Sequence, residues 1–297
     1  MSFNNQPFLI ILNTGAHRVI NKKGITELER ILDRNGIIYE INETSSHSES
    51  RQVAREASGS YQVVVAAGGD GTISSVAAGL SGTSCKLGIL PLGSGNDISR
   101  GINIPRNLND AVSLLQHGTV HPVDLGTYHD TGVFLNTLGF GFDGKVSYDA
   151  SMTTLFQGRF KYIYAVLKSI FTFRASRMTV ELSGESYSDR FLMVTIANGP
   201  VEGGGIRIAP EASLNDGLFD VVMITDVGLI RRIPLLLRIL IRGNKNEKRI
   251  LVRRSQSVSI QSTEPQFVHA DGELVSKSLD QITATIKSNV VNVITGW

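Results

Sequence analysis

The feature that most constrains the fold is a unit repeated through the first 125 residues: a short apolar run, a turn, and a segment with helical spacing. The apolar runs predict buried strands at 8–12, 37–41, 62–67 and 86–90. The helical segments fall at 26–34, 48–57, 72–80 and 108–116. Strands that alternate with helices in this way form a parallel sheet covered on both faces.

After residue 125 the pattern changes to β-rich runs separated by Gly, Asn, Asp and Ser. Runs of this kind are typical of a mainly antiparallel sandwich or barrel. Two helical segments, near 158–172 and 227–242, interrupt them. We therefore expect an α/β domain over 1–125 and a β-sandwich domain over 126–297, and we leave open whether the last strand returns to the first domain.

Composition excludes several classes of protein. The 297 residues contain 29 Lys and Arg against 27 Asp and Glu, a net charge of +2, which argues against a dedicated nucleic-acid binder. The single cysteine, Cys85, excludes an internal disulfide and fits a reducing cytosol. The N-terminus has no basic region before its short apolar run, and no stretch approaches the roughly 20 apolar residues that span a bilayer. We expect a cytoplasmic protein.

The apolar run at 62–67 ends in the loop Gly68-Gly69-Asp70-Gly71, which a helical segment follows. Glycines let the backbone approach an anion, and a helix N-terminus directs free N–H groups at it, so this corner suits phosphate. Asp70 would repel a phosphate and needs a cation such as Mg²⁺ between them. The alternative is a tight turn in which Asp70 caps its own helix.

A second loop repeats this design in "LGILPLGSGNDISRGI", where Gly93-Ser94-Gly95 leads to Asn96-Asp97 and a short helix. Loops at the carboxyl ends of two strands of one parallel sheet face the same crevice. The pair predicts a nucleotide site with two acidic positions.

Together "GGDGT" and "PLGSGNDISR" resemble the catalytic domain of the diacylglycerol kinase family, which includes sphingosine kinases and soluble bacterial lipid kinases. NAD kinases also carry GGDGT, and the second block favours the lipid kinases. The resemblance continues in order over nearly the whole chain, through VDLG at 123–126, NTLGFGFDGKV at 136–146, IANGPVEGGGIRIAP at 196–210, ASLNDGLFDVV at 212–222 and DGE at 271–273.

This resemblance implies a Rossmann-like, NAD kinase/diacylglycerol kinase-like α/β domain, a mainly antiparallel β-sandwich domain that takes the lipid, and an active site in the interdomain cleft. It implies an ATP-dependent lipid kinase that uses Mg²⁺ and converts diacylglycerol to phosphatidate. The nucleotide-binding residues that it implies are Asn13, Thr14, Gly15, Thr44, Gly68, Gly69, Asp70, Gly71, Thr72, Ile73, Ser74, Ser75, Ser94 and Asn96.

The resemblance also implies roles for the acidic residues. Glu273 matches the general base, and Asp70, Asp97 and Asp124, with Asp216, match a network that positions magnesium through water. A structural Mg²⁺ would take the Asp216 side chain and backbone oxygens of Ser213 and Leu218. Taken alone, "NDG" and Asp271-Gly272 are turns, and Glu273 is a solvated strand residue.

Two basic segments, near 158–177 and 228–254, predict peripheral contact with an anionic membrane surface. In the second segment, apolar residues at 229, 230, 233, 236, 237, 240 and 241 fit one helical face, with Arg231, Arg238 and Arg242 opposite. The alternative is that both helices pack on the sandwich and leave a solvated basic edge.

Other functions are kept as alternatives: a kinase for phosphatidylglycerol, a sphingoid base or a polyprenol, an NAD kinase, or a regulator that binds lipid or nucleotide without catalysis. The expected partner is the lipid substrate, with no nucleic acid, and a homodimer is left open.

Overall fold

The computed structural model describes residues 6–15, 22–129, 131–154, 158–243 and 247–297. Its contacts divide the chain into two compact units. Unit 1 comprises Met1–Leu125 with Ser288–Trp297, and unit 2 comprises Gly126–Lys287. The end of the last strand therefore belongs to unit 1, the point that the sequence left open.

Unit 1 is built on a parallel sheet whose strands run in the order β13-β4-β3-β1-β2. The bounds are β1 (Phe8–Asn13), β2 (Tyr39–Thr44), β3 (Val63–Gly68), β4 (Lys86–Pro91) and the end of β13 (Glu273–Thr295); β5 (Thr119–Tyr128) pairs with β13. Every residue of β1 and β3 is buried, as expected for strands covered on both faces. The parallel sheet predicted for the first 125 residues is confirmed.

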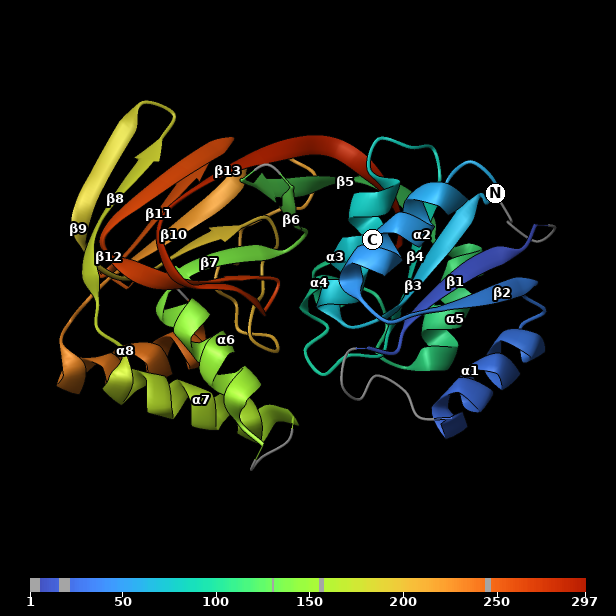
Figure 1. Ribbon diagram of the computed structural model, residues 1–297, viewed down its shortest axis with the longest axis horizontal. Helices are drawn as coiled ribbons and strands as arrows, with labels where there is room; N and C mark the ends of the chain where they lie inside the picture. Colours follow the sequence, from blue (N-terminus) through green and yellow to red (C-terminus); the bar gives the residue numbers. More distant parts are fainter. Residues whose placement is uncertain (1–5, 16–21, 130, 155–157, 244–246) are drawn as a thin grey trace. The chain divides into compact units, whose positions relative to one another are not determined.

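Helices cover both faces of this sheet (Figure 1). Their bounds are α1 (Lys22–Arg34), α2 (His47–Ala57), α3 (Asp70–Leu80), α4 (Asp97–Gly101) and α5 (Leu108–His117). The pair α2 and α3 packs on one face and the pair α1 and α5 on the other. The small residues of α3 permit its close packing, since a Cβ atom on Gly79 would lie 2.4 Å from the Arg51 carbonyl oxygen of α2.

Unit 2 is an antiparallel, β-rich unit. Its strands are β6 (Gly132–Phe134), β7 (Thr137–Gly141), β8 (Ser176–Leu182), β9 (Glu185–Ala197), β10 (Phe219–Thr225), β11 (Ile250–Ser255), β12 (Ser257–Ala270) and the first part of β13. The long strands β9 and β12 each pair with β8 through one half and with β7 through the other. Each long strand therefore joins β7 to β8. Together these strands enclose an apolar core that includes Phe140, Met178 and Phe219.

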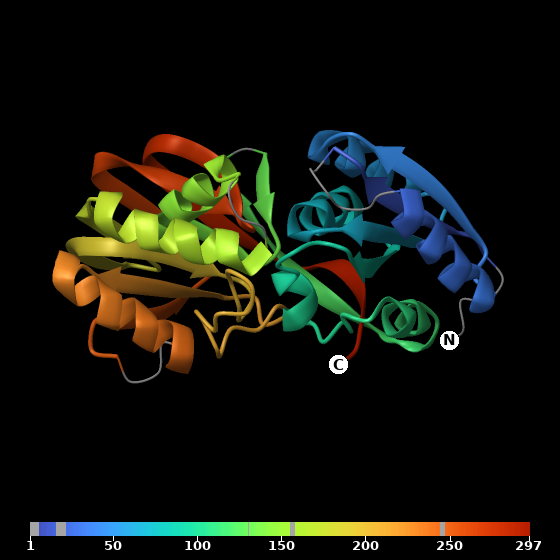
Figure 2. The ribbon, with the colours of Figure 1, turned by 90° about the horizontal axis from the view of Figure 1, so that it is seen from below.

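A second apolar core lies between β9 and β10 and three helices, α6 (Phe142–Met152), α7 (Gly158–Thr172) and α8 (Leu229–Arg242). Figure 2 shows α7 and α8 side by side over this layer of strands. The two helical segments predicted within the second half correspond to α7 and α8. The sequence did not suggest α6, whose polar composition lacks an apolar stripe and which forms against α7 and β12.

Helix α8 does not bury the apolar stripe that its sequence predicts. Leu235 and Ile239 pack into the core, whereas Leu229, Ile230 and Ile233 of the expected apolar face are exposed. Arg232 is also buried, because its guanidinium pairs with Asp226 at 2.9 Å and donates to two backbone carbonyl oxygens. Leu235 and Ile239 are not part of the stripe defined by the predicted apolar positions.

Within the described ranges, no helix combines the length and the apolar character that crossing a bilayer requires.

Candidate active site

The two glycine loops predicted from the sequence lie against each other in unit 1. They follow β3 and β4, which are parallel neighbours with Gly68 opposite Pro91. A Cβ atom built on Gly93 would lie only 2.6 Å from the Gly69 Cα atom. No residue with a side chain fits at position 93 without moving the other loop, so glycine is needed at position 93 for the loops to meet.

Asp70 has a role that neither sequence interpretation anticipated. Its Oδ2 accepts the Asp97 N–H at 3.1 Å and its Oδ1 accepts the Ile98 N–H at 3.0 Å. Asp70 therefore binds the N-terminus of α4, where a negative charge is favourable, rather than capping its own helix. The cap residue of α3 is Gly69, which makes no side-chain cap bond. One loop thus holds the other in place.

The Asp97 carboxylate comes close to that of Asp70 at a glycine. A Cβ atom built on Gly95 would lie 3.2 Å from Asp70 Oδ2 and 3.6 Å from Asp97 Oδ2. Both oxygens thus border the space that a side chain at position 95 would fill, and Arg100 lies 3.7 Å from the other oxygen of Asp97. Two carboxylates that border one small space suit a hard divalent cation held directly or through water.

The loops after β1 and β2 are joined in the same way. The Thr14 N–H donates to the Thr44 carbonyl oxygen at 2.8 Å, and Asn13 Oδ1 accepts the Gly15 N–H at 3.0 Å. A Cβ atom on Gly15 would lie 1.7 Å from the Ser45 carbonyl oxygen, so only glycine fits there. All the predicted nucleotide-binding residues therefore lie at, or just after, the carboxyl ends of four adjacent parallel strands.

These residues differ in what they can offer a ligand. The side chains of Thr72, Ile73 and Ser74 are buried in α3, and the Ile73 N–H donates to the Gly69 carbonyl oxygen. Ser94, by contrast, is exposed at the tip of its loop. The resemblance implies Ile73 among the nucleotide-binding residues, but direct contact through its side chain does not fit its place in the core.

Asp124 is completely buried in β5 and accepts the Asn289 N–H on Oδ1 at 2.7 Å. Asn289 has φ +55°, a left-handed conformation that asparagine tolerates better than most residues. This bond fixes the point at which β13 passes into unit 1. The structure therefore assigns Asp124 a structural contact in addition to the role that the resemblance implies.

Glu273 belongs to unit 2, where it is exposed at the start of β13. It pairs with Ala270 across a two-residue turn formed by Asp271 and Gly272, whose φ values are +49° and +82°. Burial raises the pKa of the nearby Tyr128 hydroxyl, and the charges of Asp271 and Glu273 raise it further. The expected turn is present, with an acidic residue at its end.

The predicted structural metal site contains an arginine. Asp216 Oδ1 accepts the Leu218 N–H at 3.0 Å, while its other oxygen contacts the Arg254 guanidinium. Arg254 also lies 3.8 Å from Asp220, whose pKa is raised by burial against the opposing effect of Arg254. A guanidinium neutralises Asp216 in this arrangement, so a metal ion would have to displace Arg254. The site does not fit an ion as it stands, and metal binding by Ser213, Asp216 and Leu218 stays a prediction.

One buried polar cluster was not predicted from the sequence. Asp143, Glu202 and His269 place a carboxylate oxygen or ring nitrogen each within 4.8 Å of one another. Asp143 and His269 are 126 positions apart along the chain, with Glu202 between them, so no local spacing could reveal the cluster. The signal that was available is that Asp143 and Glu202 lie inside blocks that carry the resemblance, 136–146 and 196–210, and that His269 lies two residues before DGE.

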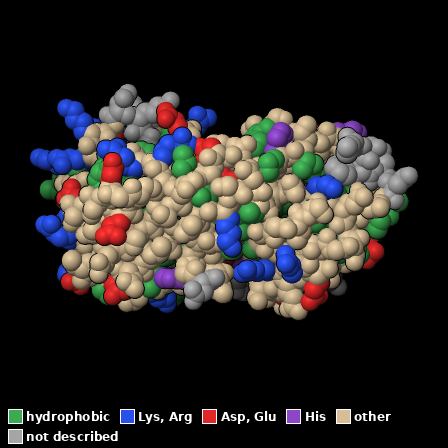
Figure 3. Space-filling model, turned by 90° about the horizontal axis from the view of Figure 1, so that it is seen from above, with side chains coloured by type: hydrophobic (Ala, Val, Ile, Leu, Met, Phe, Trp, Pro, Cys, Tyr) green, Lys and Arg blue, Asp and Glu red, His purple; other side chains and the backbone are tan. Residues whose placement is uncertain are grey.

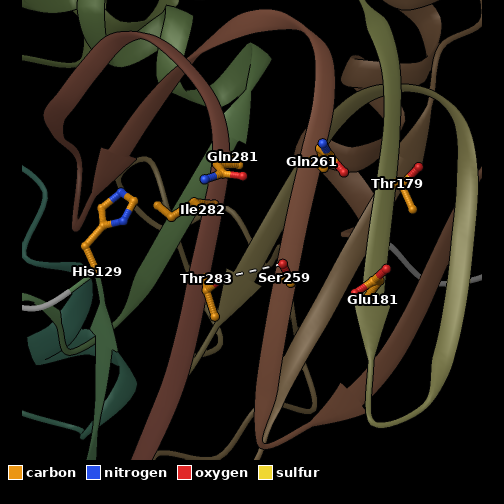
Figure 4. A pocket seen from close by; sticks show the side chains of 8 residues that line it. All are labelled: His129, Thr179, Glu181, Ser259, Gln261, Gln281, Ile282 and Thr283. Carbon is orange, nitrogen blue, oxygen red and sulfur yellow. Dashed lines mark hydrogen bonds between the residues drawn. The ribbon is translucent and has the colours of Figure 1, made fainter.

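A shallow pocket in unit 2 contains none of the predicted residues (Figure 4). It lies over β8, β12 and β13 and has mostly uncharged polar side chains, two of which, Thr283 and Ser259, are 3.4 Å apart. Because such side chains are usual on the solvated face of a sheet, the pocket does not define a chemical site.

Comparison with known proteins shows the family of the chain. The chain matches the family described as "Diacylglycerol kinase catalytic domain" over residues 7–128 and the family described as "YegS C-terminal NAD kinase beta sandwich-like domain" over residues 136–295. It is 26% identical over 269 residues to a protein of Bacillus subtilis (strain 168) named "Diacylglycerol kinase", with 89% of this chain and 88% of the relative covered.

A protein of Klebsiella pneumoniae (strain 342) named "Probable lipid kinase YegS-like" is 31% identical over 227 residues, which cover 75% of each chain. Among solved structures, a diacylglycerol kinase from Bacillus anthracis str. Sterne superposes with a TM-score of 0.73 at 22% identity, covering 98% of this chain and 97% of that one. The fold is also shared with yeast NADH kinase, at a TM-score of 0.53 and 11% identity, over 99% of this chain and 84% of the other.

Proposed function

The chain belongs to the lipid kinase family that joins a diacylglycerol kinase catalytic domain to a YegS-type C-terminal domain, and on this premise we propose that it transfers the γ-phosphate of ATP to the hydroxyl of diacylglycerol. The product is phosphatidate. The observation that carries the proposal is the contact between the two glycine loops, which brings Asp70 and Asp97 to the same small space beside Gly95.

The ATP phosphates bind at the glycine loop that precedes α3. The loop backbone can approach an anion because glycine has no side chain, and the N-terminus of α3 contributes a favourable dipole. The chain places β2 on one side of β1 and then places β3 and β4 on the other side, so the order of the parallel strands switches between β1 and β3. Ligands of open parallel sheets bind outside the carboxyl ends of the strands at such a switch point. Asn13 and Gly69 flank this point.

Asp70 and Asp97 are the residues that would hold the divalent cation accompanying ATP, and such a cation neutralises charge on the phosphates when it is bound. The bonds from the Asp97 and Ile98 N–H groups keep the Asp70 carboxylate in one orientation. The protein therefore presents this charge without having to order a mobile side chain at the time of binding.

Glu273 accepts the proton of the lipid hydroxyl. As that oxygen forms its bond to the γ-phosphorus, the bond between the γ-phosphorus and the oxygen bridging it to the β-phosphate breaks and ADP leaves. The proton passes to the Glu273 carboxylate and then to solvent, so the carboxylate is regenerated. An alcohol is too weak an acid to ionise before attack, and most of the acceleration therefore comes from positioning and charge neutralisation.

Helices α7 and α8 are proposed to bring the protein to an anionic membrane surface, where its substrate resides. The exposed apolar side chains of α7 recur every three or four residues and form one stripe: Phe160, Ile163, Tyr164, Leu167 and Phe171. The exposed apolar side chains of α8 are Leu229, Ile230, Ile233 and Leu237. Arg174, Arg231 and Arg238 are exposed on the same two segments.

Large apolar side chains exposed together, with basic residues beside them, favour a peripheral membrane surface over a simple solvated edge. Each Lys or Arg near an anionic bilayer contributes about 1 kcal/mol. On the side away from α7 and α8, hydrophobic side chains are scattered singly among the described residues (Figure 3). The outward apolar face of α8 thus supports the membrane proposal.

Vesicle sedimentation tests the membrane surface with two matched Ile→Ala variants. Ile230 is 87% exposed on α8 and Ile38 is 56% exposed in unit 1. We expect Ile230→Ala to weaken binding to vesicles rich in anionic lipid several-fold and Ile38→Ala to leave it unchanged. Equal binding by both variants, or equal binding to neutral vesicles, contradicts the proposed surface.

Purified protein with γ-labelled ATP and a panel of micellar lipids tests the function itself. The panel contains diacylglycerol, phosphatidylglycerol, a sphingoid base and a polyprenol, and NAD serves as a further acceptor. We expect label in diacylglycerol and its loss in Glu273→Gln, with ATP binding retained. Label in another lipid corrects the substrate, whereas label in NAD or in no acceptor contradicts the lipid kinase proposal for this chain.

A further inference from the structure

The turn that bears Glu273 is tied to the rest of unit 2 by two side chains. The Asp271 carboxylate accepts three consecutive backbone N–H groups at 2.8–2.9 Å, those of Leu135, Asn136 and Thr137. The Asp271 N–H donates back to the Thr137 carbonyl oxygen at 2.8 Å. These bonds fix the first half of the turn on the segment that leads into β7.

His269 ties the second half. Its ring is completely buried, and Nδ1 accepts the Gly272 N–H at 3.2 Å. Gly272 immediately precedes Glu273, and its φ of +82° is a left-handed conformation that is open to glycine. The bond from the Gly272 N–H therefore sets the direction in which the chain enters Glu273.

The hydrogen bond at Nδ1 also determines which ring nitrogen carries the proton. A nitrogen that accepts a hydrogen bond has no hydrogen of its own, so the ring proton of His269 resides on Nε2. Nε2 lies 2.7 Å from Glu202 Oε1 and 3.7 Å from Asp143 Oδ2. Asp143 is held in turn by the Thr195 hydroxyl at 2.8 Å and the Gly144 N–H at 2.8 Å.

This arrangement excludes a metal ion at the cluster of Asp143, Glu202 and His269. A metal-bound histidine coordinates through a bare nitrogen and donates from the other, the reverse of the pattern found here. The space is also closed, because a Cβ atom on Gly139 would lie 2.2 Å from both Asp143 Oδ2 and His269 Nε2. The cluster holds a histidine ring in place rather than an ion.

The pKa of His269 agrees with a cluster that holds the histidine ring in place. Burial alone would lower the pKa of His269, but the carboxylates of Glu202 and Asp143 raise it to about 10. Because Nδ1 accepts the Gly272 N–H and Nε2 already carries the ring proton, the additional proton resides on the Glu202 or Asp143 carboxylate and belongs to the cluster as a whole. The ring is thereby held between two fixed carboxylates on one side and the Gly272 N–H on the other.

We propose that His269 is a positioning residue for Glu273, with Glu202 and Asp143 fixing its ring and Nδ1 fixing the Gly272 peptide. This inference rests on the proposed function, in which Glu273 accepts the hydroxyl proton. A carboxylate that accepts a proton late in the reaction has to lie within hydrogen-bonding distance of the lipid oxygen, so a loosened turn lowers kcat more than it alters substrate binding.

Two amide variants separate this positioning role from a merely structural one. The Asn oxygen takes the place of Nδ1, so His269→Asn keeps an acceptor for Gly272 and loses the contact with Glu202. The Gln amide reaches the place of Nε2, so His269→Gln keeps the contact with Glu202 and loses the acceptor. A role in core packing predicts that Gln, the larger side chain, is the better replacement.

We expect kcat of His269→Gln to fall about five- to tenfold below that of His269→Asn, with the KM for ATP within twofold in both. Hydrogen exchange of the Gly272 amide should be faster in His269→Gln than in His269→Asn or the wild type. Equal kcat values, or a better Gln variant, overturn the inference whatever the exchange shows.

The exchange measurement needs no catalysis and therefore separates the two proposals. If Glu273→Gln remains fully active while Gly272 exchange still depends on residue 269, the assignment of the base fails and the contact to Gly272 stands. If exchange of Gly272 is the same in both amide variants, the positioning contact itself is absent and the inference is wrong.

Discussion

The contact between the two glycine loops predicts an unequal response to the same substitution. A Cβ atom at position 93 would lie 2.6 Å from the Gly69 Cα atom, nearly 1 Å inside ordinary contact, and the obstructing atom is backbone. In Gly93→Ala the loops must therefore move apart. Overpacking of this kind costs about 1–3 kcal/mol, and we expect the Tm to fall by about 3–10 °C.

Gly69→Ala is the matched control, because it adds the same atom to the other side of the same contact. Its Cβ would lie 3.5 Å from the Gly93 Cα atom, an ordinary distance, and its φ of −89° and ψ of −175° are open to alanine. Removing the freedom of a glycine from the unfolded chain stabilises a protein by about 0.4–1 kcal/mol. We expect an unchanged or slightly higher Tm.

Thermal unfolding of the two variants, followed by circular dichroism with and without ATP, measures this difference. Gly93→Ala should also lose part of the stabilisation by ATP, because its loops no longer meet as the phosphate site requires. Equal losses of Tm in both variants, or a larger loss in Gly69→Ala, would refute the loop contact from which the site was built.

Three further results are expected. Gly95→Ala should preserve the Tm and weaken Mg²⁺-dependent ATP binding in calorimetry, since its Cβ would fill the space that Asp70 and Asp97 border; unchanged binding argues against a cation there. Arg254→Ala should increase the rise in Tm that Mg²⁺ causes, because the competing guanidinium is gone; an equal rise in both proteins means that Asp216 binds no ion. The additional proton of the cluster of Asp143, Glu202 and His269 has a pKa of about 10, above the ordinary 6.5 of histidine, so the stability that it confers is complete below about pH 6.5 and is lost as the pH rises towards 10. Urea unfolding should show the wild type approaching His269→Asn in stability over that range, and a constant difference contradicts the assignment.

The elements around the glycine loops could be predicted because their signals are local. The apolar run, the glycines and the helical spacing at β3 and α3 lie within eighteen residues, from 63 to 80. The role of Asp70 could not be predicted in the same way, since its partners Asp97 and Ile98 are 27 and 28 residues away and bind it through backbone N–H groups that any residue supplies. The sequence identified the loops but not the bonds between them.

Helix α8 shows a second limit. The spacing of its apolar residues defined a stripe correctly, but spacing alone does not tell whether a stripe faces the core or the solvent. The face of α8 that packs on the core includes Arg232, which is buried because Asp226 and two carbonyl oxygens compensate its charge. Likewise, the cluster of Asp143, Glu202 and His269 is assembled only when β7, β9 and β12 pair.

The most direct test of the account is transfer of label from γ-labelled ATP to diacylglycerol by the wild type, Asp97→Asn and Glu273→Gln under saturating ATP. If the carboxylates of both units serve one phosphoryl transfer, each single variant should lose at least a hundredfold in kcat and still bind ATP. Full transfer by either variant, or a wild type that labels no lipid while binding ATP, would contradict the account.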